Sequence, residues 1–447
     1  MDIYCVEKSK EYNEKLREYI PGGVHTNYSA IIKFPSEVGT LHFNKAEKSR
    51  IWDLDGNEYL DMAAKYGAMI LGHNHPQYIM ELEKKIEQGA CFNHSDVEIS
   101  ICQRIQECMP SMERIRFCSS GTEAVQNALR VSRAYTGKKK FVRFEGNYHG
   151  NMDNIIGGKV ENPECPIPVE NSKGRGCTLG RFPRILEEQS FLVPWNDIEA
   201  IENVISRYGD EIAAVITEAI SINGGGIEPK EGYLERLREL CDEHNIVLIF
   251  DEVITGFRVS LGGAQGKLKV KPDLTIMGKS ISGGDMPLSV FGGRQDIMKL
   301  YEDYKVIHGG TFNGYSLGLT SAYATLSILK EEDYKNMEEY AKKIHEIFLK
   351  DAHEAGIDMV IQGPLTCGTF HCTDKPIHKF EQMTYRTSLK EHFVSESFAQ
   401  YGVLFSSTNR MFTNIMLGQE DVDFFAERSK AAMRMAKQKI VAIFGER

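Results

Sequence analysis

The chain has 447 residues, of which 42% are hydrophobic and 26% are charged, the balance of an ordinary globular protein. Its formal net charge of -10 argues against nucleic acid or an anionic membrane as a partner, because either would select a basic face. No apolar run reaches the roughly eighteen residues of a membrane-spanning helix, so none is predicted.

The first segment, MDIYCVEKSKEYNEKLREYI, has the pattern of a charged amphipathic helix and lacks the apolar core of a signal peptide. We therefore expect a cytoplasmic protein. The 10 cysteines include no CxxC pair, so neither a zinc ribbon nor a redox motif is predicted, and no metal site is expected.

The two ends of the chain differ from its middle. Residues 41–62 contain an Asp-Gly turn between two alternating runs, which predicts a hairpin. From about Glu331 onward the chain is helix-rich and charged, with strand-like pieces at 359–362 and 368–371. We interpret the two ends as parts of one smaller domain.

The expected organisation is an N-terminal segment with part of the small domain (1–70), a large domain (71–325) and a C-terminal small domain (326–447). Residues 151–190 are rich in Gly, Pro and polar residues, so they are either a mobile lid or an insertion.

The middle of the chain alternates short apolar runs with amphipathic stretches. The predicted strands are 115–118, 140–144, 213–217, 246–250 and 273–277, and the predicted helices between them are 122–135, 197–208 and 231–244. This alternation indicates an α/β fold with a mostly parallel sheet covered by helices. Sites in such sheets lie at the carboxyl ends of the strands.

Asp251 follows five apolar residues, at the mouth of a predicted buried strand. An unpaired carboxylate there would be costly, so Asp251 needs a partner. A protonated pyridine nitrogen would serve, and so would a helix terminus or a buried salt bridge.

Lys279 follows the next buried strand and precedes a glycine-containing loop. Partly apolar surroundings lower the pKa of a lysine and make its neutral amine available to attack an aldehyde. An acid and a lysine at two strand ends fit a cofactor whose ring nitrogen and aldehyde lie on opposite sides. The alternative is a solvated lysine that begins a loop.

The sequence Ser119-Ser120-Gly121-Thr122 lies between a predicted strand and a predicted helix. Hydroxyls and free backbone N–H groups at a helix start can bind an anion such as phosphate. Simple helix capping by Ser or Thr is the alternative.

The segments SSGTEA, EGNYHG, FDEVITGFR, MGKSISGG and GGTFNG occur in the order found in class III (subgroup II) aminotransferases. Together with PGGVHT and YGAMILGHNHP, they resemble the glutamate-1-semialdehyde 2,1-aminomutase branch of that family. The resemblance implies pyridoxal 5'-phosphate as cofactor, with a pyridoxamine 5'-phosphate form during turnover. It also implies the fold-type I architecture, a large domain with a seven-stranded, mostly parallel sheet and a smaller α+β domain.

The resemblance also assigns roles. Lys279 matches the Schiff-base lysine and Asp251 the partner of the pyridine nitrogen. The family's phosphate cup, the residues that bind the cofactor phosphate, matches Ser120, Gly121 and Thr122. The residues on the two faces of the cofactor ring match Tyr148 and Val253. Residues near the cofactor match Glu218 and Asn223, and Asn223 matches the partner of the 3-oxygen. Gly310 and Thr311 match a segment that reaches the phosphate of a second subunit, which implies a homodimer.

The resemblance fails at three positions. A substrate-binding arginine of the branch is replaced at about Ser29, a site tryptophan by Tyr66, and an expected acid by Asn409 and Arg410. Because an arginine can grip a carboxylate with two hydrogen bonds, we expect Arg410 to replace the lost arginine in binding substrate. Tyr66 is a second candidate for substrate binding. A surface arginine is the alternative. His73 and His75 are spaced like a metal pair but match a family turn.

The function expected first is an aminotransferase that moves an amino group from an amino-acid donor, such as glutamate, to a carbonyl acceptor. An aminomutase acting on a glutamate-1-semialdehyde-like substrate is the main alternative, and a racemase or lyase on the same fold is a further one. A non-catalytic protein that keeps the fold is disfavoured, because the lysine, the acid and the phosphate cup are all present.

Overall fold

The computed structural model describes residues 2–26, 38–89, 94–156, 189–406 and 409–445. Within these ranges, no helix combines the length and the apolar character that a membrane crossing requires. The chain forms two compact units. Unit 1 contains both chain ends (Met1–Ile79, Lys330–Pro376 and Met383–Arg447), and unit 2 contains Met80–Leu329 with Ile377–Gln382.

Unit 2 is built on a seven-stranded sheet with the order β4-β10-β9-β8-β7-β5-β6. The strands are β4 (Arg114–Cys118), β5 (Lys140–Phe144), β6 (Ser190–Val193), β7 (Ile212–Thr217), β8 (Val247–Glu252), β9 (Leu274–Met277) and β10 (Ser289–Gly293). Only β10 runs antiparallel to its neighbours among these strands. The predicted fold class, with its mostly parallel seven-stranded sheet, is confirmed.

Two of the seven strands were not predicted from the apolar pattern. Strand β10 ends in Gly292-Gly293, and a β-carbon on Gly293 would lie 2.0 Å from the carbonyl oxygen of Asp273. The glycines allow this close approach but weaken the strand signal in the sequence. Strand β6 is a short, half-buried edge strand beside β5.

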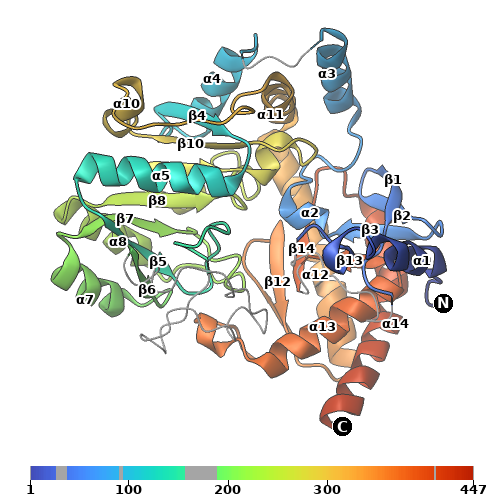
Figure 1. The fold of residues 1–447 in the computed structure, drawn as a ribbon. Coiled ribbons are helices and arrows are strands. Elements are labelled where there is room, and N and C mark those ends of the chain that lie inside the picture. Colours follow the sequence, from blue (N-terminus) through green and yellow to red (C-terminus); the bar gives the residue numbers. More distant parts are fainter. Residues whose placement is uncertain (1, 27–37, 90–93, 157–188, 407–408, 446–447) are drawn as a thin grey trace. The chain divides into compact units, whose positions relative to one another are not determined.

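Helix α5 (Gly121–Thr136) lies across the sheet and packs apolar residues against it (Figure 1). It begins with a capping box formed by Ser120 and Glu123 and ends at Gly137, whose φ of +74° favours glycine. The other helices of unit 2 are α4 (Glu98–Cys108), α7 (Ile198–Tyr208), α8 (Tyr233–Glu243), α9 (Gly263–Leu268), α10 (Gln295–Glu302) and α11 (Ser316–Ile328), with a 3-10 turn η4 at Lys279–Ser282.

Unit 1 contains two small sheets. In the first, with the order β1-β2-β3-β13, strands β2 (Arg50–Asp53) and β3 (Glu58–Met62) form the hairpin that the Asp-Gly turn predicted. Strand β1 (Phe43–Glu47) pairs with β2, and β13 (Val403–Phe405) pairs parallel to β3. A strand from near the end of the chain thus completes a sheet begun near its start.

The second sheet of unit 1 is β11-β12-β14, and three long helices pack with it. Its strands are β11 (Val360–Gln362), β12 (Cys367–His371) and β14 (Arg410–Phe412); the helices are α12 (Glu331–Glu354), α13 (Tyr385–Gln400) and α14 (Gln419–Phe444). Their buried faces share an aromatic core in which Phe348 contacts Phe370, Phe398, Phe405 and Phe425. The other helices of unit 1 are α1 (Glu7–Leu16) and α2 (Ala64–Gly67), and α3 (Pro76–Glu87) begins in unit 1 and continues into unit 2 along the chain.

Candidate active site

Four neighbouring strands of the unit 2 sheet carry the central candidate residues at their carboxyl ends. In sheet order, β9 is followed by Lys279, β8 contains Asp251, β7 is followed by Glu218, and β5 leads to Tyr148. In the β8–β9 pairing Asp251 lies opposite Ile276, three residues before Lys279. The topology therefore brings together at one sheet edge residues that are more than a hundred positions apart in the sequence.

Asp251 is buried inside β8, with 4% of its surface exposed, and not beyond the strand end as the apolar run indicated. One carboxylate oxygen accepts the backbone N–H of Val253 at 3.0 Å. The other lies 2.7 Å from His149 Nδ1. Of the alternatives that the sequence left open, the structure shows a buried acid–histidine pair and no helix cap.

His149 is the functional candidate that the sequence did not assign. It is buried, with 4% exposed, and its Nε2 has no hydrogen-bond partner among the described residues. A positive charge on the ring would offset the cost of burying Asp251, because an isolated carboxylate is strongly disfavoured in the interior. The available signal was its place directly after Tyr148 in a loop that follows a buried strand.

Glu218 anchors the loop that carries Tyr148. Its carboxylate accepts the backbone N–H of Tyr148 at 2.8 Å, and both the backbone N–H and the side-chain amide of Asn223 at 3.0 and 2.7 Å. Burial raises the pKa of Glu218, while the charge of His149 and the N–H donors oppose that rise. Asn147 adds a second anchor, since its Oδ1 accepts the Glu218 backbone N–H at 2.9 Å.

Tyr148 and Lys279 are the more accessible members of this group. The Tyr148 side chain is 37% exposed although its neighbour His149 is buried, so its ring is available to a ligand. Lys279 is half-buried and has a φ of +48°, which is uncommon for a residue with a side chain. Such a strained backbone persists where surrounding structure enforces it, often at functional sites.

The predicted phosphate cup lies at the start of α5. A β-carbon on Gly121 would lie 3.2 Å from Val253 Cγ2, and one on Gly150 would lie 2.6 Å from Thr122 Oγ1, so the cup adjoins both the β8 end and the Tyr148 loop. The first-turn N–H groups of Gly121 and Thr122 have no partner within the helix and can bind an anion.

Ser120 caps the start of α5, which is the alternative that the sequence left open. Its hydroxyl accepts the backbone N–H of Glu123 at 3.3 Å, and the Glu123 carboxylate accepts the Ser120 backbone N–H at 2.8 Å. A phosphate at Ser120 would therefore compete with the Glu123 carboxylate.

Gly310 and Thr311 lie in an exposed segment of unit 2. The segment is tied to the end of β4 through His308, whose Nε2 lies 3.4 Å from Cys118 Sγ and 3.0 Å from Asn313 Nδ2. Within one chain, this contact holds the segment near the strand that leads into the phosphate cup.

The two predicted substrate residues, Tyr66 and Arg410, both belong to unit 1. Ala64, Lys65 and Tyr66 have φ values of +43°, +49° and +60°, a left-handed run without glycine, and the buried Tyr66 hydroxyl has no hydrogen-bond partner among the residues that the structure describes. A β-carbon on the next residue, Gly67, would lie 2.6 Å from the Phe412 ring of β14, the strand that begins at Arg410. The structure thus brings the segments of Tyr66 and Arg410 together.

Asn409 has a structural role in the interior of unit 1. It is 3% exposed, and its amide donates to Glu391 Oε2 and to the Phe370 carbonyl, both at 3.1 Å. It therefore does not present a polar group to solvent where the family has an acid. The position near Ser29 and most of the 151–190 segment, expected to be a lid or an insertion, lie outside the described residues.

His73 also has a hydrogen-bonding partner within unit 1. Its Nε2 lies 2.8 Å from Asp61 Oδ2. No group of three or more potential ligands from His, Cys, Asp and Glu occurs among the residues with described positions.

The unit 2 residues fit pyridoxal phosphate. Asp251 is a buried acid suited to a protonated ring nitrogen, the partly exposed Tyr148 offers a ring face, and the helix start with its close glycine contacts offers N–H groups to a phosphate. Lys279 supplies an amine at the same sheet edge.

Residues 34–427 match the family model for class III aminotransferases. The chain is 35% identical over 437 residues to glutamate-1-semialdehyde 2,1-aminomutase of Natranaerobius thermophilus, covering 96% of this chain and 99% of that protein. The fold matches an omega-transaminase of Sphaerobacter thermophilus with a TM-score of 0.86 and 27% identity over 97% and 98% of the two chains. A glutamate-1-semialdehyde-aminomutase variant of Pseudomonas aeruginosa in complex with PMP matches in fold with a TM-score of 0.85, at 22% identity over 97% and 95%.

The chain is therefore a member of the class III aminotransferase family, whose enzymes depend on pyridoxal phosphate. Within that family, the sequence similarity places it with the glutamate-1-semialdehyde 2,1-aminomutase branch, as the motifs indicated.

Proposed function

We propose that this protein is an aminomutase, which moves an amino group between neighbouring carbons of a glutamate-1-semialdehyde-like substrate. The sequence motifs alone ranked an aminotransferase between two substrates first and an aminomutase second. The name of the 35% identical relative, which aligns along nearly its whole length, favours the second. Both reactions use the same cofactor and the same proton transfers, so the motifs at the cofactor do not separate them.

The near-full-length similarity to an aminomutase carries the choice between the two reactions, and the chemistry that they share is supported by the convergence of Lys279, Asp251 and Glu218 at the ends of three adjacent parallel strands. When bound, pyridoxal phosphate supplies an electron sink for negative charge on the substrate carbon. Asp251, held by His149, keeps a proton on the ring nitrogen. Tyr148, whose backbone N–H is held by Glu218, would offer its ring to one face of the cofactor.

Lys279 is the amine that engages the cofactor and then carries a proton between neighbouring carbons. Its short 3-10 turn, with the left-handed backbone at Lys279, fixes where the side chain leaves the sheet edge. The N–H groups of Gly121 and Thr122 bind the phosphate. Together these contacts orient the ring so that one lysine serves both carbons.

The direct test is to supply glutamate-1-semialdehyde alone, with no second amino donor or acceptor, to enzyme loaded with pyridoxamine phosphate. An aminomutase converts it completely to the isomer with the amino group on the terminal carbon. An enzyme that stops after about one equivalent, and resumes when an amino acid and a carbonyl compound are added, is an aminotransferase.

An aminotransferase stays the second candidate because of Asn409 and Arg410. Asn409, at the position where an acid was expected, donates a hydrogen bond to Glu391 in the interior. Arg410 follows it. That arginine would suit the carboxylate of an amino-acid donor.

We expect Arg410→Ala to raise the KM for the carboxylate-bearing substrate by on the order of tenfold to a hundredfold, because one charged hydrogen-bonding partner contributes about 1.5–3 kcal/mol. The cofactor absorbance should not change. Steady-state kinetics checks this, with Arg434→Ala, an exposed arginine on α14, as the matched control. An unchanged KM in Arg410→Ala would contradict the assigned role.

The protein is also expected to act as a homodimer through the segment that contains Gly310 and Thr311. Three large apolar side chains around it are exposed, Tyr304 at 96%, Ile307 at 79% and Phe312 at 65%. Clustered exposed apolar residues mark interaction sites.

Phe312→Asp should therefore weaken the dimer, with a dissociation constant raised on the order of tenfold or more, because a charge would replace a buried aromatic group. Sedimentation velocity over a range of concentrations measures this. Tyr385→Asp, at an 80% exposed position of unit 1, is the control. Equal dimer dissociation constants for the two variants would count against the segment as the interface.

A further inference from the structure

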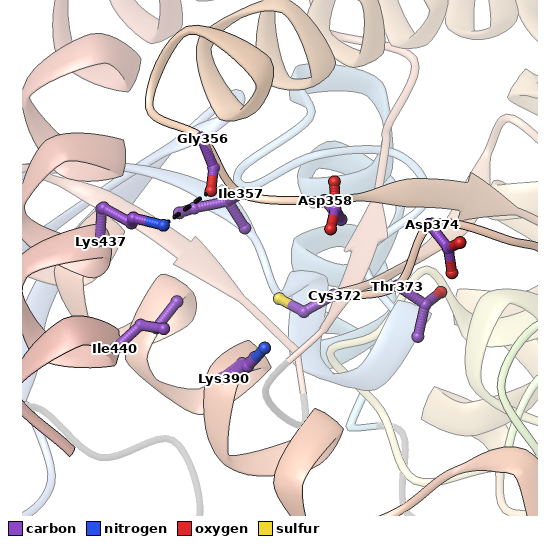
Figure 2. Close-up of a pocket in the computed structure, with 9 residues that line it drawn as sticks. All are labelled: Gly356, Ile357, Asp358, Cys372, Thr373, Asp374, Lys390, Lys437 and Ile440. Atoms are coloured by element: carbon purple, nitrogen blue, oxygen red, sulfur yellow. Dashed lines mark hydrogen bonds between the residues drawn. The ribbon is translucent and has the colours of Figure 1, made fainter. Parts of the chain in front are cut away.

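Unit 1 contains a cavity of about 270 Å³ that none of the assigned residues line (Figure 2). Four separate segments form its walls: the turn after α12, the end of β12, α13 and α14. The lining residues are Gly356, Ile357, Asp358, Cys372, Thr373, Asp374, Lys390, Lys437 and Ile440. Its volume is just below the roughly 300–1,000 Å³ of typical ligand pockets, so it suits a small metabolite.

The charges of the lining are segregated. Lys390 and Lys437 come from helices α13 and α14 on one side, and Asp358 and Asp374 lie on the strand side opposite them (Figure 2). Lys437 Nζ donates to the Gly356 carbonyl at 2.9 Å, where it also caps the end of α12. Because an ammonium has three N–H donors, Lys437 retains donors for a ligand.

Three buried residues of the lining are apolar. Ile357, Cys372 and Ile440 are 7%, 7% and 2% exposed. Burial raises the pKa of Cys372 well above its ordinary value, so the thiol is neutral and behaves as a small apolar group. A ligand would therefore meet charged groups on two sides and the buried apolar residues Ile357 and Ile440 in the remaining lining.

The walls are held in place by a buried polar network directly behind them. His371 Nδ1 lies 2.9 Å from Glu391 Oε1, with side chains 0% and 1% exposed, and Asn409 donates to the other Glu391 oxygen. Cys372 follows His371 and Lys390 precedes Glu391, so the network fixes the backbone of two walls. Such preorganisation lowers the cost of binding.

We propose that this cavity binds an α-amino acid with a short apolar side chain. The carboxylate would lie against Lys390 and Lys437, the ammonium would face the two aspartates, and the side chain would cover Ile357 and Ile440. A ligand with only one kind of charge would place that charge beside lining groups of the same sign, which is unfavourable. The inference is independent of the proposed reaction.

Three probes that differ by one group test the charge pattern: leucine, 4-methylpentanoate, which lacks the ammonium, and 3-methylbutylamine, which lacks the carboxylate. Calorimetric titration of the holoenzyme should give a dissociation constant for leucine of about 1 mM or tighter. Each analogue should bind at least about tenfold more weakly. The cofactor absorbance, recorded in the same titration, should stay constant.

Variants locate the binding. Lys390→Met and Asp374→Asn should each weaken leucine binding about tenfold or more, whereas Lys430→Met, on α14 but outside the lining, should not. Thermal melting verifies that each variant is folded. Equal affinity for the three probes, no leucine binding, or binding that persists in Lys390→Met or changes the cofactor absorbance would each overturn the proposal.

Discussion

Lys279→Ala should lower turnover by on the order of 10⁴-fold or more and remove the near-visible absorbance of the lysine-bound cofactor. The expected loss is large because one amine both engages the cofactor and moves the substrate proton. Stopped-flow spectroscopy and steady-state assays of the purified variant measure both effects. In sheet order the next two strand ends, those of β8 and β7, carry Asp251 and Glu218, which are acids and cannot replace the amine.

The matched control is Lys267→Ala, an exposed lysine of α9, which should keep the absorbance band and the wild-type rate. A second control restores the missing group: methylamine added to Lys279→Ala should recover part of the activity, because it supplies a mobile base. Wild-type turnover by Lys279→Ala would remove this residue from the scheme.

Asp251→Asn should reduce kcat by roughly 10²- to 10⁴-fold, equivalent to about 3–5 kcal/mol of transition-state stabilisation. The amide keeps the shape of the side chain but no longer holds a proton on the ring nitrogen, so the ring accepts less charge from the substrate carbon. The cofactor should still bind through its phosphate and Lys279. Kinetics together with a cofactor titration followed by absorbance separates the two effects.

His149→Asn provides the comparison that isolates the buried pair. It removes the imidazole 2.7 Å from Asp251 but leaves the carboxylate, so a smaller loss in kcat is expected, with a shifted pH profile. If Asp251→Asn and the wild type had equal kcat values, the acid would have no part in catalysis.

Elements whose apolar residues form a continuous run or one regular face were predictable from the sequence. The edge of the sheet at which the candidate residues lie was predictable as well. Strands β7 and β8 are buried at every residue, which gives continuous apolar runs, and α5 combines a capping box with a regular buried face. Strand β10 was not predicted because Gly292 and Gly293, which allow neighbouring backbone to approach closely, contribute no apolar side-chain pattern.

The members of the candidate site are a prediction from the motifs, and the contacts among them were not predictable from the sequence. The motifs named Asp251, Glu218 and Tyr148, whereas the acid–histidine pair depends on a contact between residues 102 positions apart. The capping of Ser120 by Glu123 follows the Ser-x-x-Glu spacing and matches the alternative that the sequence left open, whereas the contact of Asn409 with Glu391 depends on tertiary structure that no spacing encodes. The left-handed run through Tyr66 also has no sequence signal, because glycine is absent from its first three positions.

The proposed function requires that Lys279 is the one amine that bonds the cofactor beside Asp251. The most direct measurement is borohydride reduction of the yellow holoenzyme followed by peptide mass spectrometry. We predict a single phosphopyridoxyl group, on the peptide that contains Lys279, and loss of the yellow colour on reduction. A modified lysine elsewhere, or reduced protein with no cofactor attached, would contradict the account.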